Sequence, residues 1–170
     1  ILNLYSYISQ SVFLFKGSVF DNITLYNDYP KEKVKDILKK VGLEKFIPEM
    51  DNPDLVGENG INLSGGEKQR ISIARALIRE TDVLVADEIL SNLDNETALK
   101  IERELLNLNE ITLIAVTHRL FEETLTDFDE IIVINEGNIV ETGTFKDLID
   151  LKGLFYKIYN LSENSKIPSK

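Results

Sequence analysis

The chain has 170 residues, of which 43% are hydrophobic and 28% charged, a composition that fits one globular domain with a substantial core. Its formal net charge is −10, which argues against a nucleic-acid-binding surface because such surfaces are normally basic. The absence of cysteine excludes disulfide bonds and thiolate metal sites. No apolar run approaches the ~20 residues needed to span a bilayer, and no basic leader marks a signal peptide.

The first elements are predicted from local patterns. Leu4–Ile8 is predicted to be a short strand, because aromatic and β-branched residues roughly alternate there, and Gln10 follows its end. Pro30–Val41 is predicted to be a helix, since apolar residues recur at helical spacing and proline suits the first turn. Phe46–Asp54 is expected to be a loop, because two prolines interrupt it.

The stretch Leu63–Arg70 leads into a predicted helix over Ile71–Glu80. Ser64 precedes Glu67 by three residues, which is the spacing of a capping box. The two glycines between them leave the N–H groups and the positive end of the helix open, as in an anion-binding helix terminus. An isolated pattern of this kind is more often an ordinary capped helix.

The second half of the chain contains further predicted strands. Asp82–Asp87 is the clearest, because its four consecutive apolar residues fit a parallel strand buried on both faces. A helix over Asn95–Leu108 follows, with Asp94 as its N-cap. Two more buried strands are predicted over Ile111–Val116 and Glu130–Asn135.

A hairpin and two short helices are predicted to follow. Glu136–Asn138 turns the preceding strand back into Ile139–Glu141. Short helices are expected over Phe145–Asp150 and Leu151–Leu161. The polar tail over residues 162–170 is expected to be loose.

Polar side chains follow three of the predicted strands: Gln10, the pair Asp87 and Glu88, and His118. The carboxyl ends of parallel strands form one edge of a sheet, where ligands bind, so we expect these side chains to meet there. Asp87 is a hard oxygen ligand suited to Mg²⁺. Glu88 can polarise an attacking water as a general base, and His118 can donate a hydrogen bond to a phosphate. A lone glutamine or histidine would ordinarily be a surface or core residue.

Three segments in this order and spacing resemble the ABC transporter ATPase family. Leu63–Glu67 resembles its signature motif, Val83–Glu88 its Walker B strand, and Ser91–Asp94 its D-loop. Gln10, with the following segment Phe15–Ile23, resembles the Q-loop region in the form typical of exporters. The triple match makes the resemblance specific.

The resemblance implies an α/β fold with a P-loop NTPase-like parallel sheet, helices on both faces and a helical subdomain that carries the signature. It divides the chain into part of an ATPase domain over 1–161 and a polar tail over 162–170. Within the first part, 1–10 runs from a strand to the Q-loop, 11–80 is the helical subdomain, and 81–161 carries the Walker B strand, the D-loop, the H-loop and the C-terminal part.

The resemblance also implies ATP and Mg²⁺ as cofactors and ATP hydrolysis as the reaction of the complete protein. Asp87 and Gln10 would bind the metal, and Glu88, His118 and Gln10 would take part in catalysis. The residues expected to close over the ATP held by a partner domain are Ser64, Gly65, Gly66, Glu67 and Asp94.

The partners implied are a second nucleotide-binding domain, identical or different, and the transmembrane domain of an exporter. Val56–Glu58 resembles the exporter segment that meets the cytoplasmic loops of that transmembrane domain. The expected location is the cytoplasmic face of the cell membrane, and no nucleic-acid partner is expected.

The sequence departs from the family pattern in three ways, one of which is that Ile89, Leu90 and Asn92 differ from the commonest residues between the Walker B strand and the D-loop. No Gly-x-x-x-x-Gly-Lys-Ser/Thr motif occurs, so we expect the chain to correspond to the C-terminal two-thirds of such a domain. Alone, it should fold poorly with unpaired strand edges and exposed apolar faces, bind ATP very weakly and lack activity. Glu67 replaces the usual glutamine of the signature and brings a carboxylate near a triphosphate.

Two alternative functions remain open. A soluble ABC-family ATPase is disfavoured by the acidic charge and by the exporter-like segments Phe15–Ile23 and Val56–Glu58. A non-catalytic regulatory half of a heterodimer is disfavoured because Asp87, Glu88 and His118 are all present.

Overall fold

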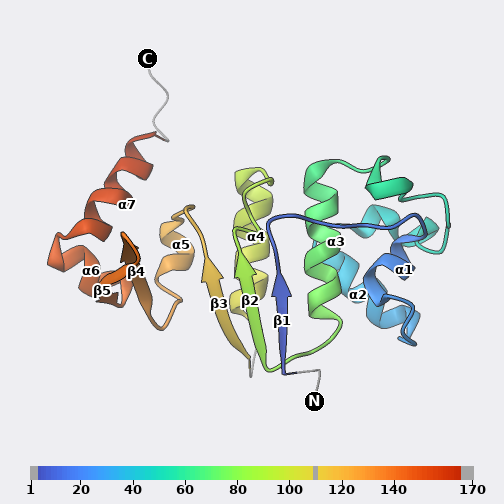
Figure 1. Cartoon of the computed structure of the whole chain (residues 1–170), viewed down its shortest axis with the longest axis horizontal. Helices are drawn as coiled ribbons and strands as arrows, with labels where there is room; N and C mark the ends of the chain where they lie inside the picture. The colour runs from blue at the N-terminus through green and yellow to red at the C-terminus, as the bar shows by residue number, and fades with distance from the viewer. Residues whose placement is uncertain (1–3, 109–110, 166–170) are drawn as a thin grey trace. The chain divides into compact units, whose positions relative to one another are not determined.

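The computed structural model describes residues 4–108 and 111–165, and its elements are drawn in Figure 1. The chain divides into two compact units, with the boundary between Thr117 and His118. The first unit contains a parallel sheet with helices, and the second contains a hairpin with helices. Over the described ranges, no helix is both long enough and apolar enough to cross a membrane.

The sheet of the first unit is parallel. It consists of β1 (Tyr5–Ile8), β2 (Val83–Asp87) and β3 (Thr112–Val116), with β2 in the middle (Figure 1). These strands begin one residue later than predicted and end at the predicted residues. The expected α/β fold with a parallel sheet is therefore confirmed.

The two faces of this sheet differ in burial. One face is buried and carries Ser6, Ile8, Leu84 and Ala86. The opposite face is exposed and carries Tyr5, Tyr7, Ile114 and Val116. The prediction that β2 is buried on both faces and that β3 is buried was therefore wrong, because no described element covers the second face. The expectation of exposed apolar strand faces is confirmed.

Two helices accompany the sheet (Figure 1). Helix α3 (Gly65–Leu77) lies beside β1, where the Ser6 hydroxyl donates to the backbone carbonyl of Ala76 at 3.5 Å. Helix α4 (Asn95–Leu106) lies behind β2, and Asp94 caps it as predicted. The capping box at Ser64 is also confirmed, although α3 ends three residues before Glu80.

Two shorter helices precede α3. Helix α2 (Lys31–Lys40) forms as predicted, with Pro30 at its N-cap. Helix α1 (Val19–Thr24) was not predicted, yet Ser18 and Asp21 form a second capping box at its start. Ser18 and Asp21 have the same three-residue spacing as Ser64 and Glu67, so this capping box could have been predicted from the sequence.

The predicted loop Phe46–Asp54 needs correction, because its first part belongs to a 3-10 helix, η1 (Glu44–Glu49). Pro48 lies inside this helix. Proline removes only its own N–H donor, so neighbouring i→i+3 bonds survive, such as that from the Phe46 N–H to the Leu43 carbonyl at 3.0 Å. A second 3-10 turn, η2 (Glu58–Gly60), precedes α3.

The second unit is built on an antiparallel hairpin of β4 (Ile131–Asn135) and β5 (Asn138–Gly143), as predicted. The prediction that β4 is buried was wrong, because among the described residues it pairs with β5 alone, and Val133 is its one buried residue. Three helices pack here: α5 (Glu122–Leu125), which was not predicted, α6 (Phe145–Leu151) and α7 (Leu154–Ser165). The buried core of this unit consists of Leu125, Val133, Leu148, Phe155 and Tyr159.

The Glu141 carboxylate caps the first N–H groups of helix α7. The Glu141 side chain accepts from the N–H of Leu154 and, at 3.0 Å, from that of Phe155. The helix continues to Ser165, so the predicted loose tail is wrong over 162–165, while 166–170 lie outside the described residues.

Candidate functional site

Two predicted site residues meet at the carboxyl edge of the parallel sheet. Gln10 lies two residues beyond β1, and Glu88 follows directly after β2. The Gln10 side-chain amide, through Nε2, donates to Oε2 of Glu88 at 2.8 Å. Residues 78 positions apart are thus in contact because their strands are parallel neighbours that end at the same edge.

A second bridge joins the same two strand ends. The Tyr7 hydroxyl on β1 donates to Oδ2 of Asp87, the last residue of β2, at 2.8 Å. The hydrogen bond to Asp87 and a smaller effect of burial raise the pKa of the Tyr7 hydroxyl above its ordinary value of 10.0. We did not predict this contact, because a tyrosine in a strand is ordinary β propensity.

The backbone of Glu88 is held as tightly as its side chain. Its N–H donates to the carbonyl of Val116, the last residue of β3, at 2.9 Å. Its φ is +48°, in the left-handed region that non-glycine residues seldom occupy. Such conformations persist where the surroundings enforce them and are enriched at functional sites. Contacts from both neighbouring strand ends therefore set the position of the Glu88 carboxylate.

His118 lies two residues beyond the end of β3 and is the first residue of the second unit. Its side chain is exposed. Its contact with a phosphate stays a prediction.

The start of α3 leaves two donors open. In the capping box, the Ser64 N–H donates to Oε2 of Glu67 at 2.6 Å, and the Glu67 N–H donates to the Ser64 hydroxyl at 3.3 Å. The N–H groups of Gly65 and Gly66 make no hydrogen bond within the described ranges. A Cβ placed on Gly65 would meet no atom within 4 Å. The space beside Gly65 is therefore open to an anion, which could accept from the two unpaired N–H groups.

The Glu67 carboxylate is buried and paired. Lys45 donates to the oxygen that the capping box does not use. Desolvation raises the pKa of Glu67, but hydrogen bonds from Lys45 and from the Ser64 backbone outweigh it, so the pKa lies below its ordinary value. The charge of Glu67 is thus compensated by Lys45, which sequence reasoning missed because it lies 22 residues upstream.

The segment resembling a D-loop packs against the start of α3. A Cβ on Gly66 would lie 3.2 Å from a methyl carbon of Leu93 and 3.5 Å from the Asn92 carbonyl oxygen. Asp94 accepts from the Thr97 N–H at 2.9 Å, and this hydrogen bond lowers the pKa of Asp94. The predicted signature and D-loop segments are therefore neighbours in the first unit.

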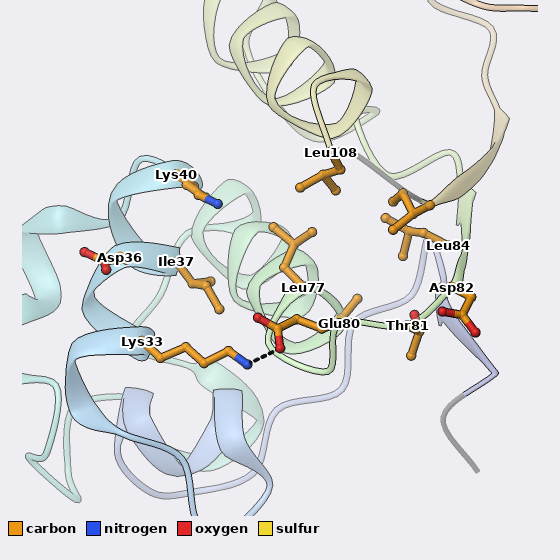
Figure 2. Close-up of a pocket in the computed structure, with 12 residues that line it drawn as sticks. Lys33, Asp36, Ile37, Lys40, Leu77, Glu80, Thr81, Asp82, Leu84 and Leu108 are labelled. Carbon is orange, nitrogen blue, oxygen red and sulfur yellow. Dashed lines mark ion pairs between the residues drawn. The ribbon is translucent and has the colours of Figure 1, made fainter. Parts of the chain in front are cut away.

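A pocket of about 630 Å³ lies elsewhere in the first unit (Figure 2). It is lined by residues that precede β2 and β3, including Thr81, Asp82 and Ile111, so it lies at the end of the strands opposite to Glu88. The Lys33 ammonium and the Glu80 carboxylate pair across it at 2.7 Å (Figure 2). This hollow is separate from the polar edge of the sheet, and we do not assign it to the predicted chemistry.

The donors at the polar edge fit Mg²⁺ better than a transition metal. Asp87 Oδ1 and the Gln10 side-chain carbonyl oxygen accept no hydrogen bond within the part of the chain that the structure describes. In the same residues, no group of three or more histidine, cysteine, aspartate or glutamate side chains could hold a metal ion. Mg²⁺ is commonly bound by one or two protein oxygens together with substrate phosphates.

Comparisons with known proteins give a consistent result. The family model described as "ABC transporter" matches residues 3–91. The chain is 37% identical over 164 residues to the ATP-dependent lipid A-core flippase of Escherichia coli K12, and equally to that of Shigella flexneri. A solved structure of a bacterial Atm1-family ABC exporter with ATP bound matches with a TM-score of 0.83 and 30% identity, over 95% of this chain and 29% of that one. The aligned residues are 94% of this chain but 28% of each flippase, so the chain spans about a quarter of the length of these relatives.

Proposed function

The chain belongs to the ABC transporter family, and from this premise we propose that it forms, in the complete protein, part of the ATP-hydrolysing domain that drives export across a membrane. The observation that carries the proposal is the contact between Gln10 and Glu88 at the carboxyl edge of the sheet, beside Asp87. An amide, a metal-binding carboxylate and a general base are among the groups that take part in phosphoryl transfer to water.

Glu88 is the residue we propose as the general base. Its backbone is fixed by the Val116 carbonyl, and its carboxylate is fixed by the Gln10 amide. A carboxylate held in this way can orient a water molecule and accept its proton during attack on the terminal phosphate of ATP. His118 is proposed to donate a hydrogen bond to that phosphate.

Asp87 and Gln10 are the residues we propose to hold Mg²⁺. Each has an oxygen that accepts no hydrogen bond among the described residues. When bound, Mg²⁺ neutralises negative charge on the phosphate oxygens. The Gln10 amide would then contact both the metal and the general base, and so couple the position of Glu88 to the presence of the metal.

The start of α3 is proposed to act on a second ATP, held by a partner nucleotide-binding domain. The unpaired N–H groups of Gly65 and Gly66 and the exposed Ser64 hydroxyl are suited to the phosphate oxygens. Asp94 lies on the segment packed beside them and is proposed to line the same interface. The Lys45 ammonium offsets the charge of Glu67, so this carboxylate should not prevent phosphate binding.

The remaining proposals concern the assembly. We propose a dimer of nucleotide-binding domains, identical or different, attached to a transmembrane domain and placed at the cytoplasmic face of the membrane. Residues 1–161 would form part of the ATPase domain, with 11–80 as its helical subdomain. The names of the relatives, a flippase and an exporter, support this direction of transport.

The substitution Glu88→Gln in the complete transporter tests the proposed function. It keeps the shape of the side chain but removes the base, so ATP hydrolysis should fall by at least about 10²-fold. The ATP-bound dimer should persist, as measured by size-exclusion chromatography with ATP. Glu80→Gln is the matched control, because Glu80 shares the left-handed backbone but lies at the opposite end of β2. Hydrolysis that remains at the wild-type rate in Glu88→Gln would refute the assignment.

A further inference from the structure

The two bridges between β1 and β2 reach adjacent carboxylates. Gln10 holds Glu88, and Tyr7 holds Asp87, at 2.8 Å in each case. Tyr7 pairs with Val85 in the strand register, so Asp87 lies two residues further along β2 on the same face of the sheet. The phenol of Tyr7 therefore leans along the sheet toward its carboxyl edge to reach Asp87.

Packing against the described residues does not explain the position of Tyr7. The residue is 54% exposed, on a face of the sheet that no described element covers. Tyr5 is its neighbour on the same strand and the same face, 62% exposed, and its hydroxyl makes no hydrogen bond within the described ranges. Of these two exposed tyrosines on the same face of β1, only Tyr7 makes a side-chain hydrogen bond among the described residues, and its partner is Asp87.

The hydrogen bond from Tyr7 orients the Asp87 carboxylate and leaves one of its oxygens available to a metal ion. It occupies Oδ2 only, while Oδ1 accepts no hydrogen bond among the residues described. A carboxylate free to rotate would lose rotamer entropy on binding a cation, and a hydrogen bond to its second oxygen removes part of that cost beforehand. Hydrogen bonds of this kind to metal-binding carboxylates typically change metal affinity by about 10- to 100-fold.

We propose that Tyr7 is a positioning residue that orients the Asp87 carboxylate for Mg²⁺ through its hydroxyl, an inference that rests on the proposed function. The effect belongs to the hydroxyl and not to the aromatic ring. In this proposal Tyr7 acts through its hydrogen bond to Asp87 and not by contact with the nucleotide or the reacting water.

The test compares Tyr7→Phe with the matched control Tyr5→Phe in the complete transporter. Mn²⁺ is the probe, and its affinity is measured by electron paramagnetic resonance in the presence of a non-hydrolysable ATP analogue. Tyr7→Phe should weaken Mn²⁺ binding by about tenfold, at the low end of the usual range because the hydrogen bond is solvent-accessible. Tyr5→Phe should leave the affinity unchanged, and both variants should unfold at the wild-type temperature.

Three results separate the possibilities. Wild-type Mn²⁺ affinity in Tyr7→Phe would overturn the role of its hydroxyl, and so would an equal loss in Tyr5→Phe. Neither result would affect the proposed function, because the general base is tested separately by Glu88→Gln. A wild-type transporter that binds no Mn²⁺ with the nucleotide analogue would overturn the magnesium site itself, and this inference with it.

Discussion

Glu67 combines a capping role with a charge in a buried position. Oε2 accepts from the Ser64 N–H at 2.6 Å, and Oε1 accepts from the Lys45 ammonium. A glutamine could keep the first contact through its carbonyl oxygen but would lose the charged pair. The capping box could be predicted from four consecutive residues, whereas Lys45 reaches Glu67 only because η1 folds next to the start of α3.

The substitution Glu67→Gln should therefore reduce stability in a pH-dependent way. The pKa of Glu67 is below its ordinary value of 4.5, so the carboxylate favours the folded state above that pH, and the contribution is lost as pH falls through the folded pKa. At about pH 7 the variant should lose ~0.5–1 kcal/mol of unfolding free energy, a small value because Lys45 is largely exposed.

Thermal unfolding of the complete ATPase domain at neutral and acidic pH measures this difference. Glu44→Gln is the control, because Glu44 is an exposed acid next to Lys45 that makes no ion pair in the described ranges. A gap between Glu67→Gln and wild type that stays constant from neutral to acidic pH would contradict the explanation.

At the scale of elements, Arg75 connects α3 to α1 and to Phe13, which precedes α1. Its Nε donates to the Asn22 carbonyl of α1 at 2.8 Å, and its Nη1 donates to the Phe13 carbonyl at 3.0 Å. Desolvation lowers the pKa of Arg75 from its ordinary value, which is consistent with a guanidinium packed between elements. One side chain thus satisfies two carbonyls from parts of the chain more than 50 residues away.

Arg75→Lys should destabilise the contact between α1 and α3 despite keeping the charge. An ammonium lacks the planar fork that reaches two carbonyls at once, so the loss should be about 1–3 kcal/mol of unfolding free energy. Chemical denaturation of the complete domain measures it. Arg103→Lys on the exposed side of α4 is the matched control and should be neutral. Equal stability of both variants would mean that Arg75 does not hold the two helices together.

Local patterns predicted the elements that have a strong local signal. The strands β1, β2 and β3 and the helices α2 and α4 were found from apolar periodicity and caps. The burial of the strands was predicted wrongly. Apolar residues show only that a strand face can be buried, and whether it is covered depends on other parts of the fold. At the site, parallel strand ends predicted the meeting of Gln10 and Glu88, while the Tyr7 contact depends on side-chain reach that periodicity does not describe.

At the scale of the whole molecule, the chain carries only some of the groups that an ATP site needs. Ser64, Gly65 and Gly66 are proposed to serve a nucleotide on a partner domain, and Asp87 and Glu88 to act at the terminal phosphate. None of the 170 residues forms a Gly-x-x-x-x-Gly-Lys-Ser/Thr loop, so no backbone cradle and no lysine in such a loop is present for the phosphates. The sheet also exposes apolar residues such as Ile114, at 50%, and Val116, at 53%.

The 170-residue chain by itself should therefore bind ATP weakly. The residues proposed for metal binding and catalysis would contact only the terminal phosphate. The phosphate loop that supplies most contacts in P-loop proteins has no counterpart in this sequence. Calorimetric titration with Mg·ATP should show no saturation below about 1 mM, which corresponds to a binding free energy weaker than ~4 kcal/mol. The complete flippase of Escherichia coli, ATP-dependent by its name, is the positive control. Saturable micromolar binding by the chain alone would mean that residues other than a phosphate loop hold the triphosphate, and the roles proposed for the sheet edge would have to be revised.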